Sequence, residues 1–352
     1  MEFNNLFPLL VFLLSFAIPA MLILFRFVSK KKYFPEFIIC FLAFATLILY
    51  HIFAPASNDF IESYDFHQIC APFFSCFLLL FIPNKIFKQY YPFIIPFFAG
   101  LIVFGAKLKT PIILTTPSYL NQIIALLLWS FISFCYRINN RISGQIFGFT
   151  CIFGFGLFIF SLLGGLPNLL GIIALSMSSS SVAFLLTNKH SLTSQLSTKG
   201  SCILGFLVGA FIILSIPEQA FGPTIILSLF PITETTFALL FYLPFIKHSS
   251  HIEENTACAK SLSSGLSEQI VTIHSLRIGF LMIIFGCFQL YASSPYSLWL
   301  ICTIIIVWQQ YRLINWQQLS SGIHDANQSF TQGIRENYSN FKKAINKMDK
   351  SK

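Results

Sequence analysis

About eleven apolar runs follow one another along this chain, most of them about 16 to 22 residues long and separated by short loops. The hydrocarbon core of a bilayer is about 30 Å thick, so each helix that crosses it needs about 20 apolar residues. Only helices and closed barrels pair their whole backbone in that environment. Charged residues make up 10% of the chain and hydrophobic residues 55%, which excludes a soluble globular protein. The sequence therefore predicts an all-α polytopic integral membrane protein.

The apolar runs divide the chain into one membrane domain, residues 1–312, and a polar C-terminal tail, residues 313–352. We expect spans at residues 6–27, 35–54, 70–87, 92–106, 118–136, 146–164, 166–187, 201–217, 222–246, 276–292 and 295–311. The cysteines are scattered singly, without the paired spacing of a metal or disulfide site. We interpret them as reduced, small apolar residues.

Lysine and arginine residues fall mainly in every second loop, as the positive-inside rule requires of cytoplasmic loops. The first loop, with Arg26 and the lysines at 30–32, therefore lies inside the cell. This orientation puts the N-terminus outside and the C-terminus inside. The net charge of +9 does not indicate nucleic-acid binding, because the basic residues are spread over many loops rather than gathered in one stripe.

The tail carries apolar residues at spacings of three, four or seven, which is typical of one face of a helix. They are Phe330, Ile334, Tyr338, Phe341, Ile345 and Met348. Lysine and arginine residues surround this stripe, so the pattern favours a basic amphipathic helix on an anionic membrane surface. A short helix that packs on the protein itself is the alternative.

Four short segments carry the most specific pattern in the chain. Residues 199–206 read Lys-Gly-Ser-Cys-Ile-Leu-Gly-Phe, residues 231–235 read Pro-Ile-Thr-Glu-Thr, and residues 265–269 read Gly-Leu-Ser-Glu-Gln. They are similar to the F-M-G-D-x-G-S-x-x-L-G-F, P-x-x-D-T and G-L-S-x-x-Q motifs of the polyprenyl-phosphate N-acetylhexosamine-1-phosphate transferases, glycosyltransferase family 4. Residues 129–144 align with the family segment that ends N-A-x-N-L-x-D-G-x-D-G. The resemblance covers about residues 72–292.

This family includes the UDP-GlcNAc:undecaprenyl-phosphate GlcNAc-1-phosphate transferases and the phospho-MurNAc-pentapeptide translocases. The resemblance implies transfer of a sugar 1-phosphate from a UDP-sugar to a polyprenyl phosphate, with release of UMP, at the cytoplasmic face of a bacterial inner membrane. It also implies Mg²⁺ as the cofactor and a place in the synthesis of cell-envelope polysaccharide or peptidoglycan precursors. A count of about eleven spans suits the UDP-GlcNAc branch of the family.

Most positions that match the family's catalytic acids carry neutral side chains in this sequence. They are Pro83, Asn84, Asn140, Ser143 and Thr198. The acid of P-x-x-D-T is replaced conservatively, by Glu234. Mg²⁺ prefers oxygen ligands, so the candidate catalytic residues are Glu234, Asn140 and Asn84, with Glu234 and Asn140 as metal ligands. An acid within a span is costly and often functional, although neighbouring threonines could instead hold Glu234 in a structural role.

Basic and small polar residues stand in or beside these loops, where a phosphate would bind. The candidates are Lys85, Arg137, Arg141, Lys199, Gly200 and Ser201. Guanidinium and ammonium groups can hold a lipid phosphate or a nucleotide without a metal. The simpler alternative is that cytoplasmic loops accumulate lysine and arginine whatever the function.

Two functional classes remain open from the residues. One is a divergent transferase, in which Glu234 and the asparagines hold Mg²⁺ while the basic side chains hold the phosphates. The other is a non-catalytic homologue that binds lipid phosphate or scaffolds an envelope-synthesis enzyme; a homodimer is a further possible assembly. A transporter is the weaker hypothesis, because the chain shows no repeated halves and few charges in the middle of its spans.

Overall fold

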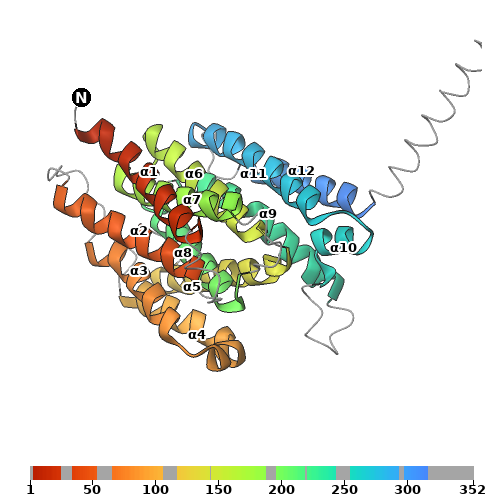
Figure 1. Cartoon of the computed structure of the whole chain (residues 1–352). Coiled ribbons are helices and arrows are strands. Elements are labelled where there is room, and N and C mark those ends of the chain that lie inside the picture. Colours follow the sequence, from red (N-terminus) through yellow and green to blue (C-terminus); the bar gives the residue numbers. More distant parts are fainter. Residues whose placement is uncertain are drawn as a thin grey trace, which may run out of the picture.

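The computed structural model describes residues 3–24, 34–53, 66–105, 117–142, 144–187, 196–218, 220–242, 254–292 and 297–315. Every regular element in these ranges is a helix, and the helices pack into one bundle (Figure 1). In chain order they are α1 (Phe3–Leu24), α2 (Phe34–Phe53), α3 (Phe66–Phe81), α4 (Asn84–Gly105), α5 (Ser118–Ile138), the short 3-10 helix η2 (Asn139–Arg141), α6 (Gln145–Leu162), α7 (Asn168–Thr187), α8 (Thr198–Leu214), α9 (Phe221–Tyr242), α10 (Ala257–Ser263), α11 (Glu268–Leu290) and α12 (Trp299–Ile314).

Five helical stretches within the described ranges are long and apolar enough to cross a membrane. They are Ser118–Arg141, Gln145–Leu162, Asn168–Leu186, Phe221–Leu240 and Glu268–Leu290. Six shorter apolar helices accompany them. The predicted class is therefore confirmed: the chain is an α-helical, multi-pass membrane protein.

Each predicted apolar run overlaps one of these helices, and the differences lie at the ends. α4 begins at Asn84 rather than at residue 92, and α11 begins at Glu268 rather than at residue 276. The first turns of both helices are polar, so hydropathy alone places their starts too late. Ser267 marks the start of α11 directly, because its side chain accepts a hydrogen bond from the backbone N–H of Ile270.

The predicted run 70–87 is wrong at its end, because α3 stops at Phe81. Proline disfavours helical backbone in the residue before it, which here is Ile82. α4 then starts anew, and the carbonyl of Pro83 accepts the N–H of Phe87 at 2.9 Å. α12 continues to Ile314, two residues past the predicted domain boundary at 312. The predicted tail helix lies outside the described residues.

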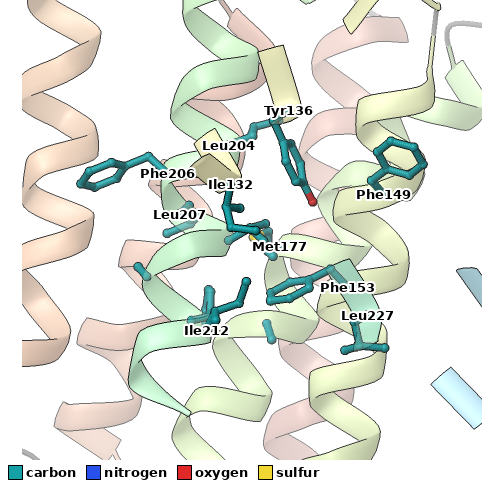
Figure 2. Close-up of a cluster of buried hydrophobic side chains, with 14 of the residues drawn as sticks. Ile132, Tyr136, Phe149, Phe153, Met177, Leu204, Phe206, Leu207, Ile212 and Leu227 are labelled. Carbon is teal, nitrogen blue, oxygen red and sulfur yellow. The ribbon is translucent and has the colours of Figure 1, made fainter. Parts of the chain in front are cut away.

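α8 runs through the centre of the bundle, and every one of its residues from Lys199 to Leu214 is buried. A helix that is apolar on all sides needs neighbours on all sides. Figure 2 shows part of the resulting core, where side chains of α5, α6, α7, α8 and α9 come together. The labelled residues are Ile132, Tyr136, Phe149, Phe153, Met177, Leu204, Phe206, Leu207, Ile212 and Leu227.

The contact between α5 and α8 depends on a glycine. A Cβ added to Gly205 would lie 2.7 Å from the Cβ of Tyr136 and 2.8 Å from the Cα of Ser133. Small residues allow such close approach of helices within a membrane. The approach lets Ser133 Oγ donate to the carbonyl of Cys202 at 2.7 Å, and Trp129 Nε1 donate to the carbonyl of Phe206 at 2.6 Å.

Candidate functional site at the polar end of the bundle

Polar side chains gather at one end of the bundle, which we call the polar end. It consists of residues 82–85, 139–141, 196–201, 231–235 and 254–258. These segments are far apart in the sequence, and hydrogen bonds connect them: residues 196–201 bond to 82–85 and to 139–141, residues 139–141 bond to 231–235, and residues 231–235 bond to 254–258. In Figure 1 the α10 part of this end lies at the right, beside α9 and below α12.

Lys199 links the start of α8 to the end of α3. Its Nζ donates to the backbone carbonyl of Ile82 at 2.7 Å and also to that of Leu80. The last carbonyls of a helix lack partners within the helix and carry partial negative charge, so an ammonium group there is stabilising. Lys199, predicted to bind phosphate, is buried in this contact.

Two asparagines of η2 connect this segment with α9. The side-chain amide of Asn140 donates to the carbonyl of Leu196 at 2.7 Å. The amide of Asn139 donates to the side-chain oxygen of Thr235 at 3.1 Å and to the carbonyl of Pro231 at 3.3 Å. Asn140 was a candidate metal ligand, whereas sequence reasoning did not single out the fully enclosed Asn139.

Glu234, the retained acid, lies in α9 and is completely buried. Its Oε1 accepts a hydrogen bond from the backbone N–H of Cys258 at 2.6 Å. That N–H belongs to the first turn of α10, which Thr256 caps through a bond from Ala259 N. Glu234 therefore holds the start of α10 in the bundle. Its other carboxylate oxygen, Oε2, has no hydrogen-bond partner among the described residues.

Cys258 sits between three polar side chains. Gln145 Nε2 donates to its sulfur at 3.4 Å, and the hydroxyl of Ser275 lies 3.9 Å from it. Burial, followed by the neighbouring charge of Glu234, raises the pKa of the Cys258 thiol well above its usual value. The thiol is therefore neutral at physiological pH and fills space rather than acting as a nucleophile.

The remaining predicted phosphate ligands differ in their availability. The guanidinium of Arg137 lies 4.0 Å from the centroid of the Tyr91 ring and donates to the Tyr91 hydroxyl. Arg141 is exposed and forms an ion pair of 3.6 Å with Glu254. Lys85 is exposed at the start of α4, where Asn84 is half-buried. Arg141 and Lys85 are thus the predicted cations that solvent can reach.

Gly200 and Ser201 belong to the capped first turn of α8. The backbone N–H of Gly200 donates to the side chain of Ser197 at 2.9 Å, and the Ser201 hydroxyl donates to the carbonyl of Thr198 at 3.0 Å. Both residues are buried. Their hydrogen bonds shape the helix start, and Thr198 occupies the position that matches a family acid.

The donors at the polar end are a poor set for Mg²⁺. No group of three or more His, Cys, Asp or Glu residues occurs within the part of the chain that the structure describes. Of the predicted ligands, Glu234 supplies the only carboxylate, and one of its oxygens is engaged by Cys258. Mg²⁺ takes six oxygen ligands and usually needs carboxylates or substrate phosphates among them. Ser143 lies outside the described residues.

The structure adds four polar residues that sequence reasoning missed: Asn139, Gln145, Cys258 and Gln310. Gln310 of α12 donates to the side chain of Thr233 at 3.3 Å, one residue from Glu234. An amide in an otherwise apolar helix was the available signal, because a buried amide requires partners.

The fold and this polar end define a class, a polytopic helical membrane protein with a buried polar layer at one end of its bundle. No protein-family model matches the chain, and no curated protein matches it either. The function is therefore argued from the residues.

Proposed function

We propose that the chain has the scaffold of a polyprenyl-phosphate N-acetylhexosamine-1-phosphate transferase and binds a polyprenyl phosphate at its polar end, without efficient sugar transfer. In this proposal it crosses a bacterial inner membrane about eleven times. The N-terminus lies outside and the polar end faces the cytoplasm. A UDP-sugar would be a second ligand at the same surface.

The observation that carries the proposal is the convergence of the motif-like segments. Residues 139–140, 199–201 and 231–235 belong to segments that resemble different family motifs, and residues 83–84 match the position of a further one, yet all of them lie at one end of one bundle. A shared binding site requires such a meeting of distant segments.

The available cations support binding of a phosphate. Arg141 is the exposed last residue of η2, and Lys85 is exposed in the first turn of α4. Guanidinium groups pair with phosphate through two parallel hydrogen bonds, and an ammonium acts as a point charge. A lipid with a phosphate headgroup presents that group at the level of the membrane surface, where both side chains would lie.

Weak transfer follows from the side chains at the matching acid positions. Pro83, Asn84, Asn140 and Thr198 carry no charge, so they give little hold on a divalent cation. One observation favours the alternative of a working transferase. The Oε2 atom of Glu234 accepts no hydrogen bond from any described residue. An oxygen that binds a metal would likewise be left without a protein donor.

Binding of radiolabelled undecaprenyl phosphate to the purified protein in nanodiscs tests the proposal. Arg141→Ala and Lys85→Ala should each weaken binding about tenfold, since a hydrogen bond to a charged group is worth about 1.5–3 kcal/mol. Lys88→Ala, which removes an exposed lysine from the same helix, is the matched control and should change binding less than about twofold. Equal affinity of all four proteins would contradict the assigned site.

Release of UMP from UDP-GlcNAc separates the two classes. Metal-dependent release that Glu234→Ala abolishes would favour the transferase. Binding of lipid phosphate without release would favour the non-catalytic homologue.

A further inference from the structure

The short helix α10 lies at the edge of the bundle, beside the part of α9 that carries Glu234 (Figure 1). Cys258 of α10 is the only hydrogen-bond partner of the Glu234 carboxylate among the described residues, through its backbone N–H at 2.6 Å. The Glu234 side chain is fully buried. A ligand that reaches Glu234 from the side of α10 must therefore displace this helix.

Little apolar surface holds α10 in place. Its buried residues are all small: Ala257, Cys258, Ala259 and Ser261. The free energy gained by burial grows with the apolar area removed from water, so these side chains anchor the helix only weakly. Polar contacts therefore contribute much of what fixes its position.

Two of these polar contacts come from the connection between α5 and α6. The guanidinium of Arg141 pairs at 3.6 Å with Glu254, which precedes α10, and both side chains are exposed. Further along the same connection, Gln145 Nε2 donates to the Cys258 sulfur at 3.4 Å. The Cys258 contact is buried, so the ion pair is the one of the two that a ligand can reach from solvent.

The position of α10 leaves one polar atom unsatisfied. Glu234 Oε2 is enclosed and accepts no hydrogen bond from any described residue. A buried carboxylate oxygen without a partner is unfavourable, and water would solvate it if α10 moved away. The turn between α10 and α11 contains Gly265, whose φ is 100°, and a turn of this kind can act as a hinge.

We infer that residues 254–263 form a lid over Glu234, latched by the ion pair of Glu254 with Arg141 and opened when a phosphate replaces Glu254. The inference rests on the proposed function, because the phosphate is that of the polyprenyl lipid. Binding of the lipid thereby uncovers Glu234, the one acid retained at a family position. In the free protein the lid keeps this acid away from solvent.

Hydrogen exchange of the full chain in nanodiscs, followed by mass spectrometry, tests the lid with undecaprenyl phosphate as the probe. Saturating lipid should speed exchange in peptides that cover α10 by about two- to fivefold, as expected for the loss of an exposed ion pair. Peptides from α8, at the centre of the bundle, should be unchanged. Glu254→Gln should speed α10 exchange equally without lipid, and added lipid should then change it less than about 1.5-fold. Glu218→Gln is the matched control and should behave as wild type does.

Lipid binding measured in the same samples separates the lid from the proposed function. If the lipid binds to wild type but exchange of α10 stays the same or slows, the lid is refuted and the proposed function stands. If no lipid binds, the proposed function is refuted, and so is phosphate as the trigger of the lid. Equal exchange of α10 in Glu254→Gln and wild type without lipid would show that Glu254 is no latch, and would overturn the inference however the lipid behaves.

Discussion

The Oε1 atom of Glu234 accepts a hydrogen bond from the backbone N–H of Cys258 at 2.6 Å, and this bond ties α10 to α9. Twenty-three residues separate the two positions, and part of that stretch lies outside the described residues. The bond gives Glu234 a structural role whether or not the protein has a catalytic activity. It also explains how an acid can remain in an otherwise apolar helix.

Replacing Glu234 should therefore destabilise the protein. Glu234→Ala removes the acceptor and should lower the free energy of unfolding by about 2 kcal/mol, the usual worth of a hydrogen bond to a charged group. Glu234→Gln keeps a carbonyl oxygen at the same place and should cost less than half as much. Thermal unfolding in detergent, followed by circular dichroism, gives both values. Equal stability of wild type and Glu234→Ala would show that α10 is held by other contacts.

The labelling rate of the Cys258 thiol tests the same contact between α9 and α10. Its raised pKa keeps the thiol protonated at pH 7 to 8, so labelling by a maleimide should be slow and should rise only at a pH well above the usual value for cysteine. Glu234→Ala frees the first turn of α10 and should lower the free energy of its local opening by about 1.4 kcal/mol. Labelling should then be at least about tenfold faster. The measurement uses a protein in which Cys258 is the only cysteine. Fast labelling of that protein with Glu234 intact would contradict its burial.

The long helices were predictable from the sequence, because an apolar run of sufficient length indicates a helix that crosses the membrane. The apolar runs located every long helix, but α10 has only seven residues and no apolar run. Its signal was the capping residue Thr256, with small residues after it, which a search for apolar runs passes over. The polar starts of α4 and α11 were missed for the same reason.

The candidate site was predictable in part. The resemblance pointed to residues 231–235 and 199–206; residues 231–235 and 199–201 do lie at one end of the bundle, whereas residues 202–206 continue into its core. It assigned Lys199 to phosphate, whereas the structure directs this side chain to the last carbonyls of α3. Sequence alone does not reveal which carbonyls a lysine will meet, because the approach of α8 to α3 is set by packing throughout the core.

Lys199→Met should test that structural role. The substitution keeps an apolar chain of similar length but removes the ammonium, leaving the carbonyls of Leu80 and Ile82 without this donor. We expect a loss of about 2 kcal/mol of stability and faster hydrogen exchange at the end of α3. Lys88→Met, an exposed lysine on the adjacent helix, is the control and should stay within about 0.5 kcal/mol of wild type. If both variants are equally stable, the contact with Leu80 and Ile82 contributes little.

Gly205→Val should disrupt the contact of α5 with α8. The first added carbon atom would already lie 2.7 Å from Tyr136 and 2.8 Å from the backbone of Ser133, so the helices must separate. Overpacking of this kind costs about 1–3 kcal/mol. Gly100→Val is a suitable comparison, since the nearest atom to its added Cβ is a Leu126 side chain at 3.7 Å. A melting temperature that falls equally for both would argue against close packing at Gly205.

If Arg141 binds phosphate as we propose, its ion pair with Glu254 competes with that binding. Glu254→Gln removes the negative charge 3.6 Å from the guanidinium and should raise the affinity for undecaprenyl phosphate by about two- to fivefold, as expected for an exposed pair. Glu218→Gln makes the same change of charge in the segment before α9, away from the polar end, and should not alter binding. Equilibrium binding to nanodiscs measures both. A weaker affinity in Glu254→Gln would exclude Arg141 as the phosphate ligand.

The most direct test compares undecaprenyl phosphate binding and UMP release in one preparation, with and without EDTA. We predict that the protein binds the lipid phosphate equally well in EDTA and in Mg²⁺, and that it releases no UMP from UDP-GlcNAc above the level of Glu234→Ala. Binding that EDTA abolishes, or UMP release that depends on Mg²⁺ and on Glu234, would contradict metal-free binding at the polar end.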